Sequence, residues 1–119
     1  MKRFLILIFI IFLPSLSNGL IAKDHNWVTA HFIVNGVCDQ CKKRIESAAY
    51  IKGVKFAGWD VDTHDLTLKY DSSRVSPDDV LRQIALAGHD AGSFKATDED
   101  YKKIPKCCRY RDGAKMPGK

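Results

Sequence analysis

Residues 27–49, WVTAHFIVNGVCDQCKKRIESAA, contain a change of apolar period that decides the fold. Up to Val34 apolar and polar residues alternate, which is typical of a half-buried strand. From Cys41 the apolar positions recur at helical spacing instead. We therefore predict a strand, a short loop that holds Cys38, and a helix that opens at Cys41.

The residues that follow predict two more strands, a second helix and a short last strand. Two strands are expected at Val54–Val61 and Leu66–Tyr70, with a bulge at Ala57-Gly58. The run Ser76-Pro77-Asp78-Asp79 combines a capping side chain, a first-turn proline and acidic residues, so it predicts a helix start. A short last strand is expected at Ala91–Lys95. This order predicts an α+β protein, a ferredoxin-like βαββαβ sandwich with a four-stranded antiparallel sheet and two helices on one face.

The first 22 residues have the three parts of a secretory signal peptide. A basic start is followed by an apolar run, Phe4 to Leu13, and then by small polar residues, with cleavage expected near Gly19 or Ala22. The apolar run is shorter than the roughly 20 residues that span a bilayer, so no membrane insertion is expected after cleavage. We expect an exported protein, periplasmic or extracellular.

The mature chain is long enough for one small domain, expected at residues 23–96, followed by a polar extension at 97–119. Without Lys2 and Arg3 the chain keeps 17 basic residues against 14 acidic ones, a slight excess. The longest basic block is Lys42-Lys43-Arg44, which is too small to indicate a nucleic-acid partner.

The spacing of Cys38 and Cys41 favours function over a structural disulfide, since the ring that this pair would close restricts little of the unfolded chain. Two thiolates at a loop-to-helix junction can bind one ion, and a helix N-terminus favours negative charge. A site with only a few ligands, all of them soft thiolates, suits Cu(I) and, by the same argument, Hg(II). Zn(II) prefers four ligands in a closed structural site.

Landmarks on both sides of this pair closely resemble the heavy-metal-associated (HMA) domain family over roughly Val28 to Ala96. The matching runs are Val34–Glu46, Lys52–Val54, Trp59–Asp62, Leu66–Asp71 and Leu86–Ala91. The family includes copper chaperones, modules of copper-transporting ATPases and periplasmic mercury-binding proteins, all ferredoxin-like. The resemblance implies a metallochaperone that binds a soft ion, foremost Cu(I), with Hg(II) or Zn(II) as alternatives, and passes it to a partner. Many members carry methionine where this chain has Gly36, so a more mobile loop is expected.

Three further side chains are candidate ligands. His89 is expected in a loop at the same end of the sheet as Cys38, where it would bind the ion or hydrogen-bond a thiolate. Cys107 and Cys108 would form a disulfide, remain free, bind a second ion, or add sulfurs to the first site if the extension folds back. The last arrangement would favour storage or sensing over transfer.

The same two thiols leave a redox function open, because thiol–disulfide exchange uses this spacing at the same place on a helix. No nucleophile with an orienting base and acid, and no phosphate-binding glycine loop, is recognisable, so we expect a protein that is not an enzyme. Lys42, Lys43 and Arg44 beside the pair predict a donor or acceptor partner with an acidic surface.

Overall fold

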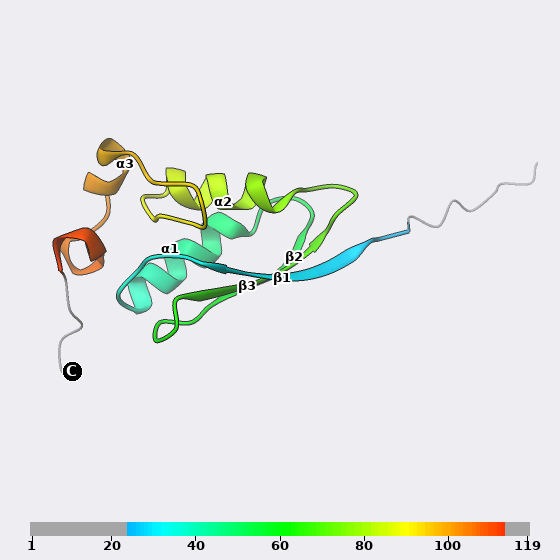
Figure 1. The fold of residues 1–119 in the computed structure, drawn as a ribbon, viewed down its shortest axis with the longest axis horizontal. Helices are drawn as coiled ribbons and strands as arrows, with labels where there is room; N and C mark the ends of the chain where they lie inside the picture. Colours follow the sequence, from blue (N-terminus) through cyan, green and yellow to red (C-terminus); the bar gives the residue numbers. More distant parts are fainter. Residues whose placement is uncertain (1–23, 114–119) are drawn as a thin grey trace, which may run out of the picture.

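The computed structural model describes residues 24–113, so the signal peptide predicted at 1–22 lies outside the described residues. Three strands and two main helices follow one another along the chain: β1 Trp27–Ile33, α1 Asp39–Ala49, β2 Val54–Trp59, β3 Asp65–Asp71 and α2 Pro77–Leu86. Both helices cover the same face of the sheet (Figure 1). Within the described part of the chain, no helix has the length and apolar character to cross a membrane.

The sheet is antiparallel with the order β1-β3-β2. Alternation on β3 places Leu66, Leu68 and Tyr70 toward the helices, where they join one core with Ile45 of α1 and Ile84 of α2. The predicted strand–helix–strand–strand–helix order is therefore confirmed up to the end of α2.

The start of α2 is the helix cap that its sequence predicts. The Ser76 hydroxyl accepts a hydrogen bond from the Asp79 amide, the Asp79 carboxylate accepts one from the Ser76 amide, and Pro77 occupies the first helical turn. These reciprocal bonds satisfy backbone donors that have no partner within the helix.

The predicted fourth strand at Ala91–Lys95 is wrong for the described residues, whose sheet has three strands. Ala91 pairs with Val34, just beyond the end of β1, through an isolated bridge, and then with Phe94 across a tight turn. Gly92 adopts the left-handed conformation at φ 55° and turns the chain back on itself. The chain therefore reaches the edge of β1 but leaves it before a ladder can form.

The bulge predicted at Ala57-Gly58 is also wrong, because both residues pair regularly with β3. The register shift lies between Val54 and Phe56, where Lys55 is the extra residue. Lys55 and Phe56 are consequently exposed in succession, and this pair breaks the hydrophobic alternation of the strand.

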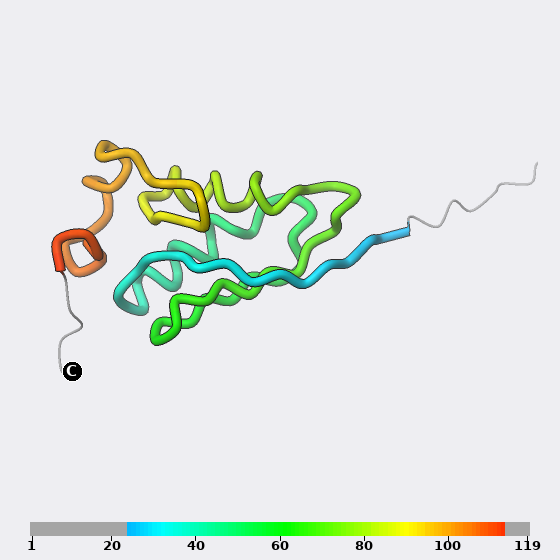
Figure 2. Tube along the Cα trace, in the orientation of Figure 1, coloured from blue at the N-terminus to red at the C-terminus, as the bar shows by residue number. Residues whose placement is uncertain are grey.

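Residues 97–113, hereafter the tail, form α3 (Asp98–Lys102) and two short 3₁₀ turns, η1 (Lys106–Cys108) and η2 (Tyr110–Asp112). Figure 2 shows the tail running past the end of the domain where α1 begins. Tyr101, Ile104 and Cys108 are buried and join the core of the domain. The extension thus has no core of its own but shares that of the domain.

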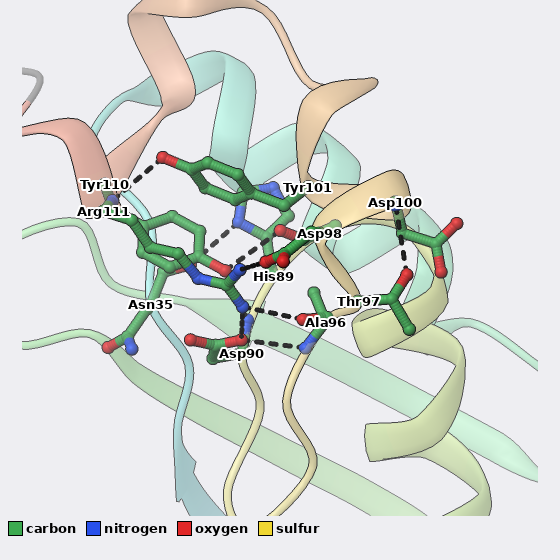
Figure 3. Close-up of polar contacts among 11 residues, drawn as sticks. Asn35, His89, Asp90, Ala96, Thr97, Asp98, Asp100, Tyr101, Tyr110 and Arg111 are labelled. Carbon is green, nitrogen blue, oxygen red and sulfur yellow. Dashed lines mark hydrogen bonds and ion pairs between the residues drawn. The ribbon is translucent and has the colours of Figure 1, made fainter.

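Two tail residues, Tyr110 and Arg111, fasten the tail to the loop after α2 (Figure 3). The Tyr110 hydroxyl accepts a hydrogen bond from the Asp90 amide at 2.9 Å and donates one to the Gly88 carbonyl at 3.0 Å. Burial raises the pKa of Tyr110 to about 12, so this hydroxyl keeps its proton at neutral pH. The Arg111 guanidinium donates to the Asp90 carboxylate and to the Ala96 carbonyl, both at 2.7 Å.

Replacing Arg111 with alanine is expected to release the tail. Arg111 also stacks over Tyr101, so its loss removes charge-assisted hydrogen bonds and a cation–π contact together. We expect the free energy of tail opening to fall by about 2 kcal/mol, measured as faster amide hydrogen exchange at Cys108. Lys103→Ala is the control, since Lys103 is exposed and its ion pair, with Asp100, lies within the tail. Equal exchange in the two variants would contradict this role of Arg111.

Candidate metal centre

Cys38 and Cys41 lie on either side of the first residues of α1. Cys38 is the N-cap residue in extended conformation, and Cys41 is the third residue of the helix, which begins two residues earlier than predicted. Their sulfur atoms are 3.6 Å apart, and both side chains are buried. The loop-to-helix junction therefore brings two thiols together where the helix amides favour negative charge.

The tail places a third sulfur at this site. The Cys108 Sγ lies 3.4 Å from that of Cys38, and the Cys41 Sγ lies 4.0 Å from the Cys108 carbonyl oxygen. The sulfurs of Cys38, Cys41 and Cys108 all lie within 4.8 Å of one another, and all three are free thiols. Such a cluster can hold one soft ion between its sulfurs.

Cys107 is placed differently from its neighbour. It is exposed, its thiol donates a hydrogen bond to the Gln40 side-chain oxygen at 3.2 Å, and its sulfur lies 3.9 Å from that of Cys108. Cys107 therefore lies next to the cluster of three sulfurs without being part of it.

The environment acts in opposite directions on two of the thiols. Burial raises the pKa of Cys38, but the backbone amides of Cys41 and Gln40 and the neighbouring thiols outweigh it, so the pKa lies below its usual range. Burial is also the largest effect on Cys108 and raises the pKa of that thiol strongly, with Arg44 opposing the shift. Cys38 is therefore the more readily ionised of these two thiols.

His89 is buried and holds a basic side chain, Arg44, in place. Its Nδ1 donates to the Asn35 carbonyl at 2.8 Å, so its Nε2 accepts a hydrogen bond from Arg44 at 3.3 Å. The ring stacks on Tyr110 of the tail. Because both ring nitrogens are engaged, His89 in this arrangement orients Arg44 and offers no lone pair to a metal.

Trp59 explains the glycine at position 36. A Cβ at Gly36 would lie 2.9 Å from the indole ring of Trp59 and 3.1 Å from the Cβ of Cys41. The indole donates from Nε1 to the Val34 carbonyl at 2.9 Å. The loop before Cys38, expected to be more mobile without methionine, is thus packed closely by a tryptophan from β2.

The model of the heavy-metal-associated domain matches residues 31–90, half of the chain. This match begins near the end of β1 and spans the thiol pair, both main helices, β2, β3 and the His89 position. The chain belongs to the HMA family. The resemblance inferred from the sequence landmarks is therefore confirmed, and membership supports binding of a heavy metal by the cysteines.

Solved structures of other proteins resemble this one. The CopZ metallochaperone is 29% identical, with a TM-score of 0.52 over 54% of this chain and 98% of its own. The N-terminal domain of a potential copper-translocating P-type ATPase from Bacillus subtilis, solved in the Cu(I)-loaded state, is 26% identical, with a TM-score of 0.51 over 54% of this chain and 82% of its own.

Oxidized MerP from Ralstonia metallidurans CH34 is 20% identical, with a TM-score of 0.53 over 56% of this chain and 94% of its own, and this likeness shows the fold alone. No curated protein sequence matches the chain.

The contacts between the tail and the HMA domain were not predicted from the sequence. Tyr110 and Arg111 contact Asp90, and Ile104 packs against Gly88, where a Cβ would lie 2.5 Å from the isoleucine side chain. The only available signal was the occurrence of large apolar and aromatic residues in an otherwise polar extension, which hinted at burial without naming a partner.

Buried His89 makes the stability of the domain depend on pH. Burial, with Arg44 adding to it and Asp90 opposing it, lowers the pKa of His89 to about 4 from 6.5. Between these values His89 is protonated in the unfolded chain but neutral in the folded chain, so the free energy of unfolding falls as pH falls. We expect a loss of about 3 kcal/mol between pH 6.5 and 4, measured by denaturant unfolding. His89→Gln should flatten this dependence, and parallel curves for the two proteins would refute it.

Adding one methyl group at Gly36 is expected to disturb the thiol site sterically. Gly36→Ala should cost about 1–3 kcal/mol through overpacking against Trp59 and Cys41. Trp59→Phe removes the indole atoms nearest to Gly36, so the double variant should cost less than the sum of the single ones. Chemical denaturation of the four proteins measures this coupling, and strict additivity would mean that the predicted clash is absent.

Proposed function

We propose that this protein binds Cu(I) through Cys38 and Cys41 and carries it to a partner protein outside the cytoplasm. The observation that carries the proposal is the pair of buried thiols, 3.6 Å apart, at the N-terminus of α1. Identities of 29% and 26% to a metallochaperone named CopZ and to a Cu(I)-loaded ATPase domain support copper as the ion.

The donor set favours a soft monovalent ion. Thiolates select Cu(I), and two or three sulfurs are enough for it, whereas structural Zn(II) sites use four ligands. The group of mutually close ligands among residues 24–113 holds three sulfurs and no carboxylate or imidazole. Hg(II) is equally soft and is the main competing ion.

The surface offered to a partner is smaller than the basic block predicts. Lys42 bonds to Glu46 and the Trp59 carbonyl, and Arg44 faces His89, so both are half-buried. Lys43 is exposed, as is Lys106 next to Cys107. These two lysines are the positions at which we propose that an acidic partner surface docks.

The ion can pass to a partner protein by exchange of thiolate ligands, with protons and charge conserved. A partner thiol loses its proton as its sulfur binds the ion, and the higher-coordinate intermediate then releases one thiolate of this chain, which takes up a proton. Repeating this exchange for each remaining thiolate of this chain completes the transfer. The ion keeps its charge throughout, and no electron moves. The protein thus acts as a carrier of the ion and catalyses no reaction.

Anaerobic titration of the reduced protein with Cu(I) against a competing chelator tests the binding step. We expect one ion per chain, with Cys38→Ser/Cys41→Ser weakening the affinity by more than about 100-fold, which is about 2.7 kcal/mol. Cys107→Ser is the control, since it removes a nearby thiol outside the cluster. Tighter binding of Hg(II) than of Cu(I) under matched competition would replace copper as the cargo, and undiminished binding by the double variant would reject this site.

The kinetics of release test the carrier function. If the ion passes directly between thiols, the rate of transfer from loaded protein to a peptide with a Cys-x-x-Cys sequence should rise with peptide concentration. A rate independent of the peptide would mean release of free ion and would contradict direct handover. Insulin reduction by the same thiols, together with weak Cu(I) binding, would favour the redox alternative, which the lowered pKa of Cys38 permits.

A further inference from the structure

The tail presents one of two adjacent cysteines to the thiol pair and leaves the other in solvent. Cys108 is fully buried, with its sulfur 3.4 Å from that of Cys38, while Cys107 is exposed and bonds to Gln40. A buried cysteine is often only a small apolar residue in a core. Here, however, the sulfur faces two other sulfurs.

Given metal binding at Cys38 and Cys41, on which this inference rests, we propose that Cys108 is the third ligand, so that the ion is held by three thiolates and enclosed by the tail. The three sulfurs lie within 4.8 Å of one another, as a shared ion requires, and Cys107 is not among them. The site is thus three-coordinate, and one of its ligands comes from outside the matched HMA region, residues 31–90.

The surroundings of Cys108 suit a thiolate bound to a cation. Three thiolates around Cu(I) carry two net negative charges, which a buried site needs to offset. The positive charge of Arg44 favours ionisation of the Cys108 thiol, and His89, fixed by the Asn35 carbonyl, accepts a hydrogen bond from the same guanidinium. A charged side chain that is itself held in place by a histidine is typical of the polar groups around metal ligands in proteins.

The position of Cys108 depends on contacts made by the tail itself. Tyr110 bonds to both Gly88 and Asp90, Arg111 pairs with Asp90, and Ile104 packs on Gly88. These contacts lie on both sides of η1 in the sequence, so the turn that carries Cys108 is held at each end. Because they are noncovalent, the tail can open, and Cys108 is the ligand that an incoming thiol displaces first.

X-ray absorption of the protein loaded with one Cu(I) per chain, checked as monomeric by size exclusion, tests the third ligand. We expect an average of three sulfurs in the wild type and in Cys107→Ser, and two in Cys108→Ser. Cys108→Ala serves as a second variant if serine proves unstable in the buried position. The Cys108 variants should also hand Cu(I) to the Cys-x-x-Cys peptide faster than Cys107→Ser does.

The outcomes separate the two proposals. Two sulfurs in the wild type, or an unchanged sulfur number in the Cys108 variants, would overturn the third ligand while leaving the Cys38/Cys41 site intact. A loss of the third sulfur in Cys107→Ser instead would also overturn it. Binding that survives Cys38→Ser/Cys41→Ser would reject the proposed function itself.

Discussion

The Tyr110 hydroxyl joins the tail to the loop after α2 by accepting from the Asp90 amide and donating to the Gly88 carbonyl. A phenol that stays protonated is suited to this double role, and its ring stacks on His89 at the same time. One side chain therefore fixes the tail and covers the buried histidine. Together with the contacts of Arg111 and Ile104, this attachment sets the position of Cys108 relative to Cys38.

The electrostatics of the centre follow from the same arrangement. The amides at the start of α1 favour ionisation of Cys38. Cys108 is buried away from solvent, where an isolated thiolate has a high free energy. A bound cation removes that cost, because it neutralises charge at the point where the sulfurs converge. The buried Cys108 thiol therefore gains most from a cation bound among the three sulfurs.

Much of the fold could be predicted because local patterns specified it. The alternation before Val34, the helical spacing after Cys41 and the Ser76–Asp79 cap are short-range signals, and the structure confirms each of them. The misplaced bulge and the missing fourth strand have a different origin. Lys55 and Gly92 depart from the strand pattern through backbone geometry that depends on the partner strand, which hydrophobic periodicity does not record.

The sequence by itself determined that two thiols flank the start of a helix in an HMA domain, since three-residue spacing and family landmarks are properties of neighbouring residues. Only the tertiary structure decided which other groups meet them. Cys108 lies 70 residues from Cys38, and nothing local distinguishes it from exposed Cys107. The choice between them depends on how the tail packs, and so does the assignment of His89 to Arg44, because contacts between distant segments are set by the whole core.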